Sequence, residues 1–140
     1  MRILSQIQAL DNALEAWERY RQIPFENLVQ EKDTQYMVCH ALLLSIQASV
    51  DIATVIAVMK TPRRPGTYRE TFLVLGKFGI ISEDLAKELS RLAGFRNILV
   101  HEYTTLDLHR VYRILQDDHT IMKTFMNLVK EFIKENKKAQ

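Results

Sequence analysis

Four polar residues with the types needed for acid–base chemistry lie close together near residue 100. They are Arg96, Asn97, His101 and Tyr103, in the stretch R-N-I-L-V-H-E-Y (Arg96–Tyr103). Histidine titrates near neutral pH, so His101 can take a proton from a ribose 2′-hydroxyl or give one to a leaving oxygen. Arg96 offers a planar fork of donors for charge building on a phosphate, and Asn97 can orient the imidazole. These residues suit phosphodiester cleavage without a metal and with a 2′,3′-cyclic phosphate product.

The spacing of these residues sets a geometric problem. On a helix, Arg96 and Tyr103 share one face, whereas Asn97 and His101 share a neighbouring one. Arg96 and His101, five positions apart, diverge by about 140° at 3.6 residues per turn. They can meet at one substrate only if the helix ends or bends between them, or if a second subunit brings its own pair alongside. The apolar residues between them are expected to pack inward: Ile98, Leu99 and Val100.

The same pattern has a plainer interpretation. Short motifs often match by chance, so Arg96 can be an ordinary residue near a helix C-terminus and His101 a surface residue. Tyr103 alone is typical of a half-buried aromatic. The residues by themselves leave both interpretations open.

The elements around the motif are predicted to be helices throughout. Apolar residues recur every three or four positions in Ile3–Trp17, Asp33–Lys60, Tyr68–Lys77, the segment after the N-cap Ser82, and the long segment after Asp107. The pair Gly76 and Gly79 is expected to close the third of these helices. We therefore predict an all-α, antiparallel bundle of about five helices.

The segment Asp33–Lys60 is predicted to be apolar on more than one side. Such a helix is either central or shared with a second subunit. Polar residues interrupt it, so no apolar run is expected to approach the ~20 residues that span a bilayer. Two of them, Gln47 and Asp51, share a face and can line a cleft, fix a dimer or satisfy a polar seam.

Composition bounds the remaining possibilities. The 140 residues suit a single domain, 1–140, with a lysine-rich and frayed tail at about 134–140. The net charge of +2 neither demands nor excludes a nucleic-acid partner. One cysteine, Cys39, fits a reducing cytosol or simply a small buried hydrophobe. Without a recognisable leader, a cytoplasmic protein with no membrane partner is expected.

Charged and metal-ligating residues outside the motif give weaker signals. Lys60, Arg63, Arg64 and Arg69 form a basic cluster around a proline loop, which can track an RNA backbone, dock a protein partner or simply be solvated. No histidine outside the motif has a partner at zinc-ligand spacing: His40, His109 and His119. We expect neither a metal nor a cofactor.

The motif also resembles that of a known family. G-F-R-N-I-L-V-H-E-Y (Gly94–Tyr103) is similar to the signature of the HepT-like toxins of the HEPN superfamily: arginine, four residues, histidine, one residue, tyrosine, with a polar residue directly after the arginine. The segments Thr67–Leu89 and Val38–Ala57 resemble the family as well, whereas the first and last helices match in pattern only.

The resemblance implies a concrete function. HepT-like proteins are homodimeric bundles whose arginine–histidine motifs face each other across the dimer cleft and cleave RNA without a metal. They are the toxins of type II/VII-like toxin–antitoxin pairs, and an MNT nucleotidyltransferase antitoxin neutralises them by transferring AMP to the tyrosine of the motif, here Tyr103. The added charge would compete with RNA phosphate for Arg96 and His101.

Two alternatives to a ribonuclease toxin remain open at this point. One is a non-catalytic helical adaptor, or the substrate-binding subunit of a two-component nucleotidyltransferase. The other is a helical homodimer with no site.

Overall fold

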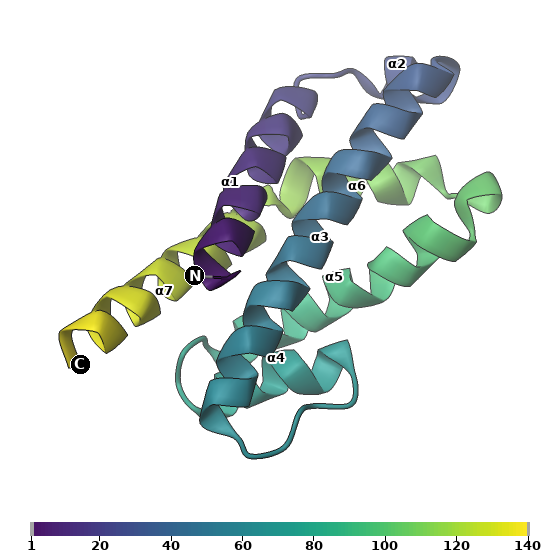
Figure 1. Cartoon of the computed structure of the whole chain (residues 1–140). Coiled ribbons are helices and arrows are strands. Elements are labelled where there is room, and N and C mark those ends of the chain that lie inside the picture. Colours follow the sequence, from purple (N-terminus) through teal and green to yellow (C-terminus); the bar gives the residue numbers. More distant parts are fainter. Residues whose placement is uncertain (1, 140) are drawn as a thin grey trace.

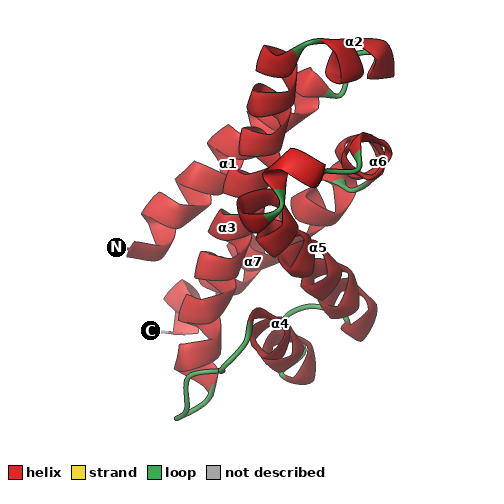
Figure 2. Ribbon diagram, turned by 90° about the vertical axis from the view of Figure 1, so that its right-hand side faces the viewer, coloured by secondary structure: helices red, strands yellow, loops and turns green. Residues whose placement is uncertain are grey.

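The chain folds into seven α-helices and one short 3₁₀ helix within residues 2–139, the part that this computed structural model describes (Figure 1). The side chains of Arg2, Tyr103 and residues 137–139 lie outside the description. The helices are α1 (Arg2–Tyr20), α2 (Phe25–Gln30), α3 (Lys32–Lys60), α4 (Tyr68–Lys77), α5 (Glu83–His101), η1 (Tyr103–Thr105), α6 (Leu108–Asp117) and α7 (His119–Ala139). No strand occurs among these residues (Figure 2), so the all-α prediction is confirmed.

Helix α3 is the centre of the bundle. It packs against α1, α4, α5 and α7, and Figure 1 shows α1 and α3 side by side and antiparallel. Its inward side chains are fully buried: Val38, Leu42, Ile46, Ile52 and Ile56. Met59, near the C-terminal end of the same helix, is 59% exposed. The broad apolar surface of this helix therefore serves mainly the core of one chain, and part of it stays open.

The prediction of about five helices is wrong, for two separate reasons. The first is α2, a six-residue helix that begins directly after Pro24 and buries only Leu28. The second is a break at Asp118 (φ −97°, ψ 1°), which divides the expected last helix into α6 and α7. Carbonyl groups in the last turn of α6 bond to the α1 side of the molecule: Leu115 O accepts from Trp17 Nε1 at 2.7 Å, and Gln116 O accepts from Arg21 Nε at 3.2 Å.

The corner between α4 and α5 follows the local sequence closely. Ser82 Oγ accepts a hydrogen bond from Leu85 N at 3.0 Å, which confirms it as the N-cap of α5. Gly79 has a φ of +74°, a conformation that favours glycine. Gly76 lies inside α4 rather than closing it, and a Cβ there would lie 3.4 Å from Ala86 Cβ. That distance is an ordinary van der Waals contact, so the packing of α4 against α5 does not itself require a glycine at this position.

One helix passes a length-and-composition test for crossing a membrane. An 18-residue window in α3 has a mean hydropathy of 2.0, so the expectation that no segment approaches a spanning length is wrong. This window is 56% buried inside the bundle. The core helix of a soluble protein passes the same test, and for that reason the finding is weak evidence for a membrane segment.

Candidate active site

Arg96 lies on α5 and its side chain faces α3 and α4. The guanidinium is half-buried, and its Nε donates to Gln47 Oε1 at 2.9 Å. Its Nη1 donates to Asn97 Oδ1 at 3.4 Å, and its Cζ lies 6.0 Å from the centre of the Tyr68 ring. Contacts on several sides therefore hold this arginine within a single chain.

Gln47 joins Arg96 to a carboxylate without an ion pair. The Gln47 amide donates from Nε2 to Asp51 Oδ1 at 3.0 Å and accepts from Arg96 at Oε1. Since a carboxylate only accepts and a guanidinium only donates, the two neighbours together fix the orientation of the amide. The neutral amide separates the opposite charges, so Arg96 keeps its charge available for another anion. The four-residue spacing of Gln47 and Asp51 predicts a shared helix face, but nothing in the sequence places Arg96 beside them.

His101 has entirely different surroundings. It is the last residue of α5, its side chain is exposed, and none of the hydrogen bonds or ion pairs between described residues involves it. Its successor Glu102 ends the helix with non-helical backbone angles (φ −124°, ψ 32°) and donates from its backbone N–H to Ile98 O. Nothing in the described part of the chain fixes the imidazole.

Helix α5 runs without interruption from Arg96 to His101. The helix therefore does not end between the two residues, which diverge by about 140° around its axis. A contribution from a second subunit, one of the ways in which they could meet at one substrate, stays a prediction.

The residues between Arg96 and His101 pack inward only in part. Leu99 is buried and Ile98 is half-buried, but Val100 is 41% exposed, so the expectation for Val100 is wrong. A shallow groove of about 460 Å³ opens beside Leu99, with α3 forming its other wall. Its lining is mostly apolar: Tyr36, Met37, Cys39, His40, Leu43 and Leu99. An apolar surface of this kind thus adjoins the His101 end of α5.

Tyr103 begins the 3₁₀ helix η1 directly after the end of α5. Its side chain lies outside the described residues. The prediction that Tyr103 carries a modification therefore remains a prediction.

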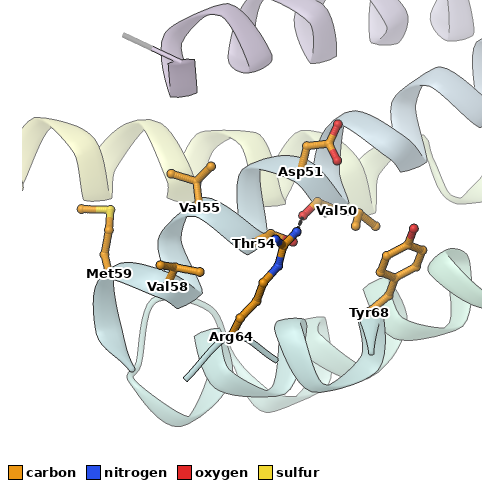
Figure 3. A pocket seen from close by; sticks show the side chains of 8 residues that line it. All are labelled: Val50, Asp51, Thr54, Val55, Val58, Met59, Arg64 and Tyr68. Atoms are coloured by element: carbon orange, nitrogen blue, oxygen red, sulfur yellow. Dashed lines mark hydrogen bonds between the residues drawn. The ribbon is translucent and has the colours of Figure 1, made fainter. Parts of the chain in front are cut away.

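The four cations predicted around the proline loop are all exposed but have different neighbours, and their contact with RNA stays a prediction. Lys60 Nζ lies 5.4 Å from the centre of the Phe132 ring on α7, while Arg63 and Arg69 are exposed. Arg64 extends across a groove between α3 and the start of α4 (Figure 3). This groove has a volume of about 560 Å³ and is lined by Val50, Asp51, Thr54, Val55, Val58, Met59, Arg64 and Tyr68. Of the four cations, Arg64 is the one that shares a groove with Tyr68, the ring beneath Arg96.

Cys39 and two of the other histidines differ in burial and in their neighbours. Burial raises the pKa of the Cys39 thiol to about 11, which makes it unreactive at neutral pH. His109 stacks on Phe25 at 4.5 Å between ring centres. His119 is buried between α1 and α7, and burial lowers its pKa. In the described part of the chain, no three His, Cys, Asp or Glu side chains gather as metal ligands would.

The fold and the family of the chain emerge from comparison with known proteins. A tri-AMPylated HEPN toxin of Shewanella oneidensis, solved in complex with an MNT antitoxin, superposes with a TM-score of 0.83 at 24% identity, covering 92% of this chain and 96% of that one. The helical bundle is thus a HEPN fold. The family model described as "Ribonuclease HepT-like" matches residues 10–129, a span that includes the whole Arg96–Tyr103 motif, and the chain belongs to this family.

The names of two relatives agree with this family. The tRNA nuclease HepT of Aphanizomenon flos-aquae is 28% identical over 110 residues, which are 79% of this chain and 75% of the relative. The mRNA nuclease HepT of Shewanella oneidensis is 30% identical over 84 residues, 60% of this chain and 63% of the relative. The two relatives share a name for the protein but differ in the named RNA.

Proposed function

We propose that this chain is the ribonuclease toxin of a toxin–antitoxin pair in the cytoplasm, and that it cleaves RNA without a metal. The observation that carries the proposal is the position of Arg96. Its side chain contacts Gln47 and Tyr68, and it lies in the region where the chain matches a ribonuclease family. A guanidinium with its Nε engaged still offers its outer N–H groups to a phosphate. Names of relatives as tRNA and mRNA nucleases support the same class of substrate.

The reaction follows from the two side chains. The ribose 2′-oxygen attacks the neighbouring phosphorus, the bond from phosphorus to the 5′-oxygen breaks, and a 2′,3′-cyclic phosphate results. His101 moves the proton of the 2′-hydroxyl or supplies one to the leaving 5′-oxygen, a role suited to an imidazole. Arg96 stabilises the charge on the phosphate oxygens in the transition state, and Asn97 supports either group.

The proposed site is completed by a second copy of the chain. A single α5 cannot aim Arg96 and His101 at one phosphate, so Arg96 of one protomer would act with His101 of its partner. Exposed apolar side chains near the His101 end of α5, Val100 and Met37 among them, support a dimer contact there. Packing of the two copies would also give His101 the surroundings that it lacks in one chain.

The proposed regulator is an MNT nucleotidyltransferase antitoxin that transfers AMP to Tyr103. The complex of the Shewanella toxin with such an antitoxin supports this partner. AMP on a residue two positions after His101 would place a phosphate near the groups that bind the RNA phosphate. The intact mass of the protein made with its genomic neighbour should rise by one or more AMP units, and Tyr103→Phe should prevent the gain.

Cleavage by the purified protein tests the proposed function. Unmodified protein, incubated with RNA and EDTA, is expected to yield fragments ending in 2′,3′-cyclic phosphate. Arg96→Ala and His101→Ala should each lower the rate by about 100-fold or more, and each should relieve the growth arrest that expression causes. If the protein cleaves no RNA under any salt or metal condition, the catalytic claim is lost and a non-catalytic adaptor becomes the better reading.

A further inference from the structure

The groove that holds Arg64 begins where the Arg96 site ends. Tyr68 belongs to both, since its ring lies 6.0 Å from Arg96 Cζ and also lines the groove. Asp51 belongs to both as well, because Gln47 links its carboxylate to Arg96. A chain molecule with a phosphate on Arg96 would therefore continue directly into this groove.

The lining of the groove combines an apolar floor with polar groups at its edges. Val50, Val55, Val58 and Met59 supply the apolar part of the lining, and Figure 3 shows Arg64 and Tyr68 on two sides of the open space, while Asp51 lines it from α3. Its volume of about 560 Å³ lies in the range of small-molecule sites. A flat apolar ring with polar edges, attached to an anion, fits such a lining.

The polar groups of the groove keep unused bonding capacity. Asp51 accepts one hydrogen bond at Oδ1, and Arg64 has neither an ion pair nor a hydrogen bond from its guanidinium among the described residues. The loop that carries Arg64 is nevertheless ordered, since Thr61 Oγ1 donates to Arg63 O at 2.8 Å and Gly66 N donates to Glu70 Oε2 at 2.9 Å. The arginine is thus presented to the groove by a structured loop.

The two charges of the groove select the kind of ligand. A simple polyanion would be attracted by Arg64 but repelled by Asp51. A nucleotide satisfies both, because its phosphate suits the guanidinium while an amino group on its base suits the carboxylate, as in carboxylate recognition of the cytosine amino group. The Tyr68 ring offers a surface on which a base can stack.

We propose that this groove binds one nucleotide of the RNA, next to the phosphate held by Arg96, with its base at Tyr68 and Asp51 and its phosphate at Arg64. The proposal rests on the proposed ribonuclease function. It makes the groove a specificity site that prefers a base with an exocyclic amino group, such as cytosine or adenine, over uracil.

A double-mutant cycle, which combines Tyr68 variants with RNAs that lack a base, tests whether the groove binds a nucleotide. Short single-stranded RNAs are compared with copies that lack one base beside the cleavage point, using wild type, Tyr68→Leu and Tyr68→Phe. Loss of the base should lower kcat/KM about tenfold for wild type and for Tyr68→Phe, the scale of base–aromatic stacking, and should have little further effect in Tyr68→Leu. Equal losses in all three proteins would overturn the proposal.

Asp51 and Arg64 provide independent variants. Asp51→Asn should reduce the preference for cytosine over uracil at that nucleotide several-fold, while Arg64→Gln should weaken the effect of removing the base. Arg63→Gln is the matched control, because Arg63 does not line this groove, and should affect intact and abasic RNA equally. An unchanged base preference in Asp51→Asn would contradict the assignment of Asp51.

Measurements of RNA binding distinguish a failure of the proposed nucleotide site from a failure of the proposed ribonuclease function. The same RNA pairs are titrated by fluorescence anisotropy against wild type, Tyr68→Leu and His101→Ala. If wild type binds with the expected dependence on Tyr68 but never cleaves, the groove stands and the ribonuclease function fails. If wild type cleaves RNA, but removing the base has the same effect on cleavage and binding in wild type and Tyr68→Leu, the nucleotide site in the groove is rejected. The proposed ribonuclease function would then still stand.

Discussion

Arg96 and His101 lie on one helix, but the two residues have opposite surroundings. Arg96 is half-buried and contacts Gln47, Asn97 and Tyr68, whereas the His101 side chain is exposed at the helix end and forms no hydrogen bond or ion pair with the described residues. One half of the site is therefore preorganised within a single chain, and the other half is not. Because catalysis needs both groups to be fixed, the proposed composite site has a second protomer supply the surroundings of His101.

The largest expected effect comes from disrupting the proposed dimer contact beside His101. Val100→Asp puts a charge on an exposed apolar position between the two proposed catalytic residues. The proposed dimer should then dissociate, and RNA cleavage should fall by about 100-fold, the scale of losing a proton-transfer group. Sedimentation and cleavage rates measure both effects. Leu4→Asp, at a similarly exposed residue of α1, is the control. A Val100→Asp protein that stays dimeric and active would contradict this placement of the interface.

A smaller effect is expected at the preorganised half. Gln47→Glu would let Arg96 pair directly with a carboxylate, so its charge would be less available to phosphate and cleavage should fall about tenfold. Gln47→Ala, which removes the positioning bond but adds no charge, should cost less. Gln8→Glu makes the same charge change on an exposed residue of α1 and serves as the control. Equal activities of Gln47→Glu and Gln47→Ala would show that the neutral amide does not protect Arg96.

The smallest expected effect is on the pH dependence of stability and comes from His119, which is buried whereas His101 is exposed. Burial lowers its pKa from the ordinary value of 6.5, while the Leu14 carbonyl and the Glu18 carboxylate partly oppose the shift. The unfolded chain then binds a proton more readily than the folded one, so stability should fall as pH drops below about 6.5 and level off below the folded pKa. Between about pH 7 and pH 5, wild type should lose a few degrees of Tm.

The variant His119→Gln should show a flatter dependence of Tm on pH, whatever its absolute stability. His101→Ala is the matched comparison and should leave the dependence unchanged, because the His101 side chain is exposed and has no hydrogen bond or ion pair with the described residues that folding would form. A pH dependence that is identical in wild type and His119→Gln would remove His119 as its source.

The sequence predicts those helix boundaries that short-range chemistry sets. Ser82 caps α5 through a hydrogen bond to a residue three positions on, and α4 occupies the predicted residues Tyr68–Lys77. The break between α6 and α7 could not be predicted in this way, because the Trp17 indole that bonds Leu115 O is 98 residues away in sequence. Local periodicity holds no information on such a partner.

For the candidate site, too, the sequence predicts the local features but not the contacts between distant segments. The Arg-x4-His spacing and the resemblance to a known motif pointed to Arg96 and His101, and spacing alone raised the question of how they could meet. The contacts of Arg96 with Gln47 and Tyr68 join three helices, with Gln47 lying 49 residues from Arg96. Only the packed fold reveals them. The groove lined by Arg64 could not be predicted either, because nothing in the sequence distinguishes Arg64 from the other three cations around the proline loop.

The most direct test of a site shared between two chains is to mix wild type with the Arg96→Ala, His101→Ala double variant at constant total concentration. If each site needs both protomers, every mixed dimer is inactive, so activity should fall as the square of the wild-type fraction, to about a quarter at equal amounts. If each chain carried its own complete site, activity would fall in proportion, to about half. A linear decline in a mixture shown to contain mixed dimers would contradict the composite site.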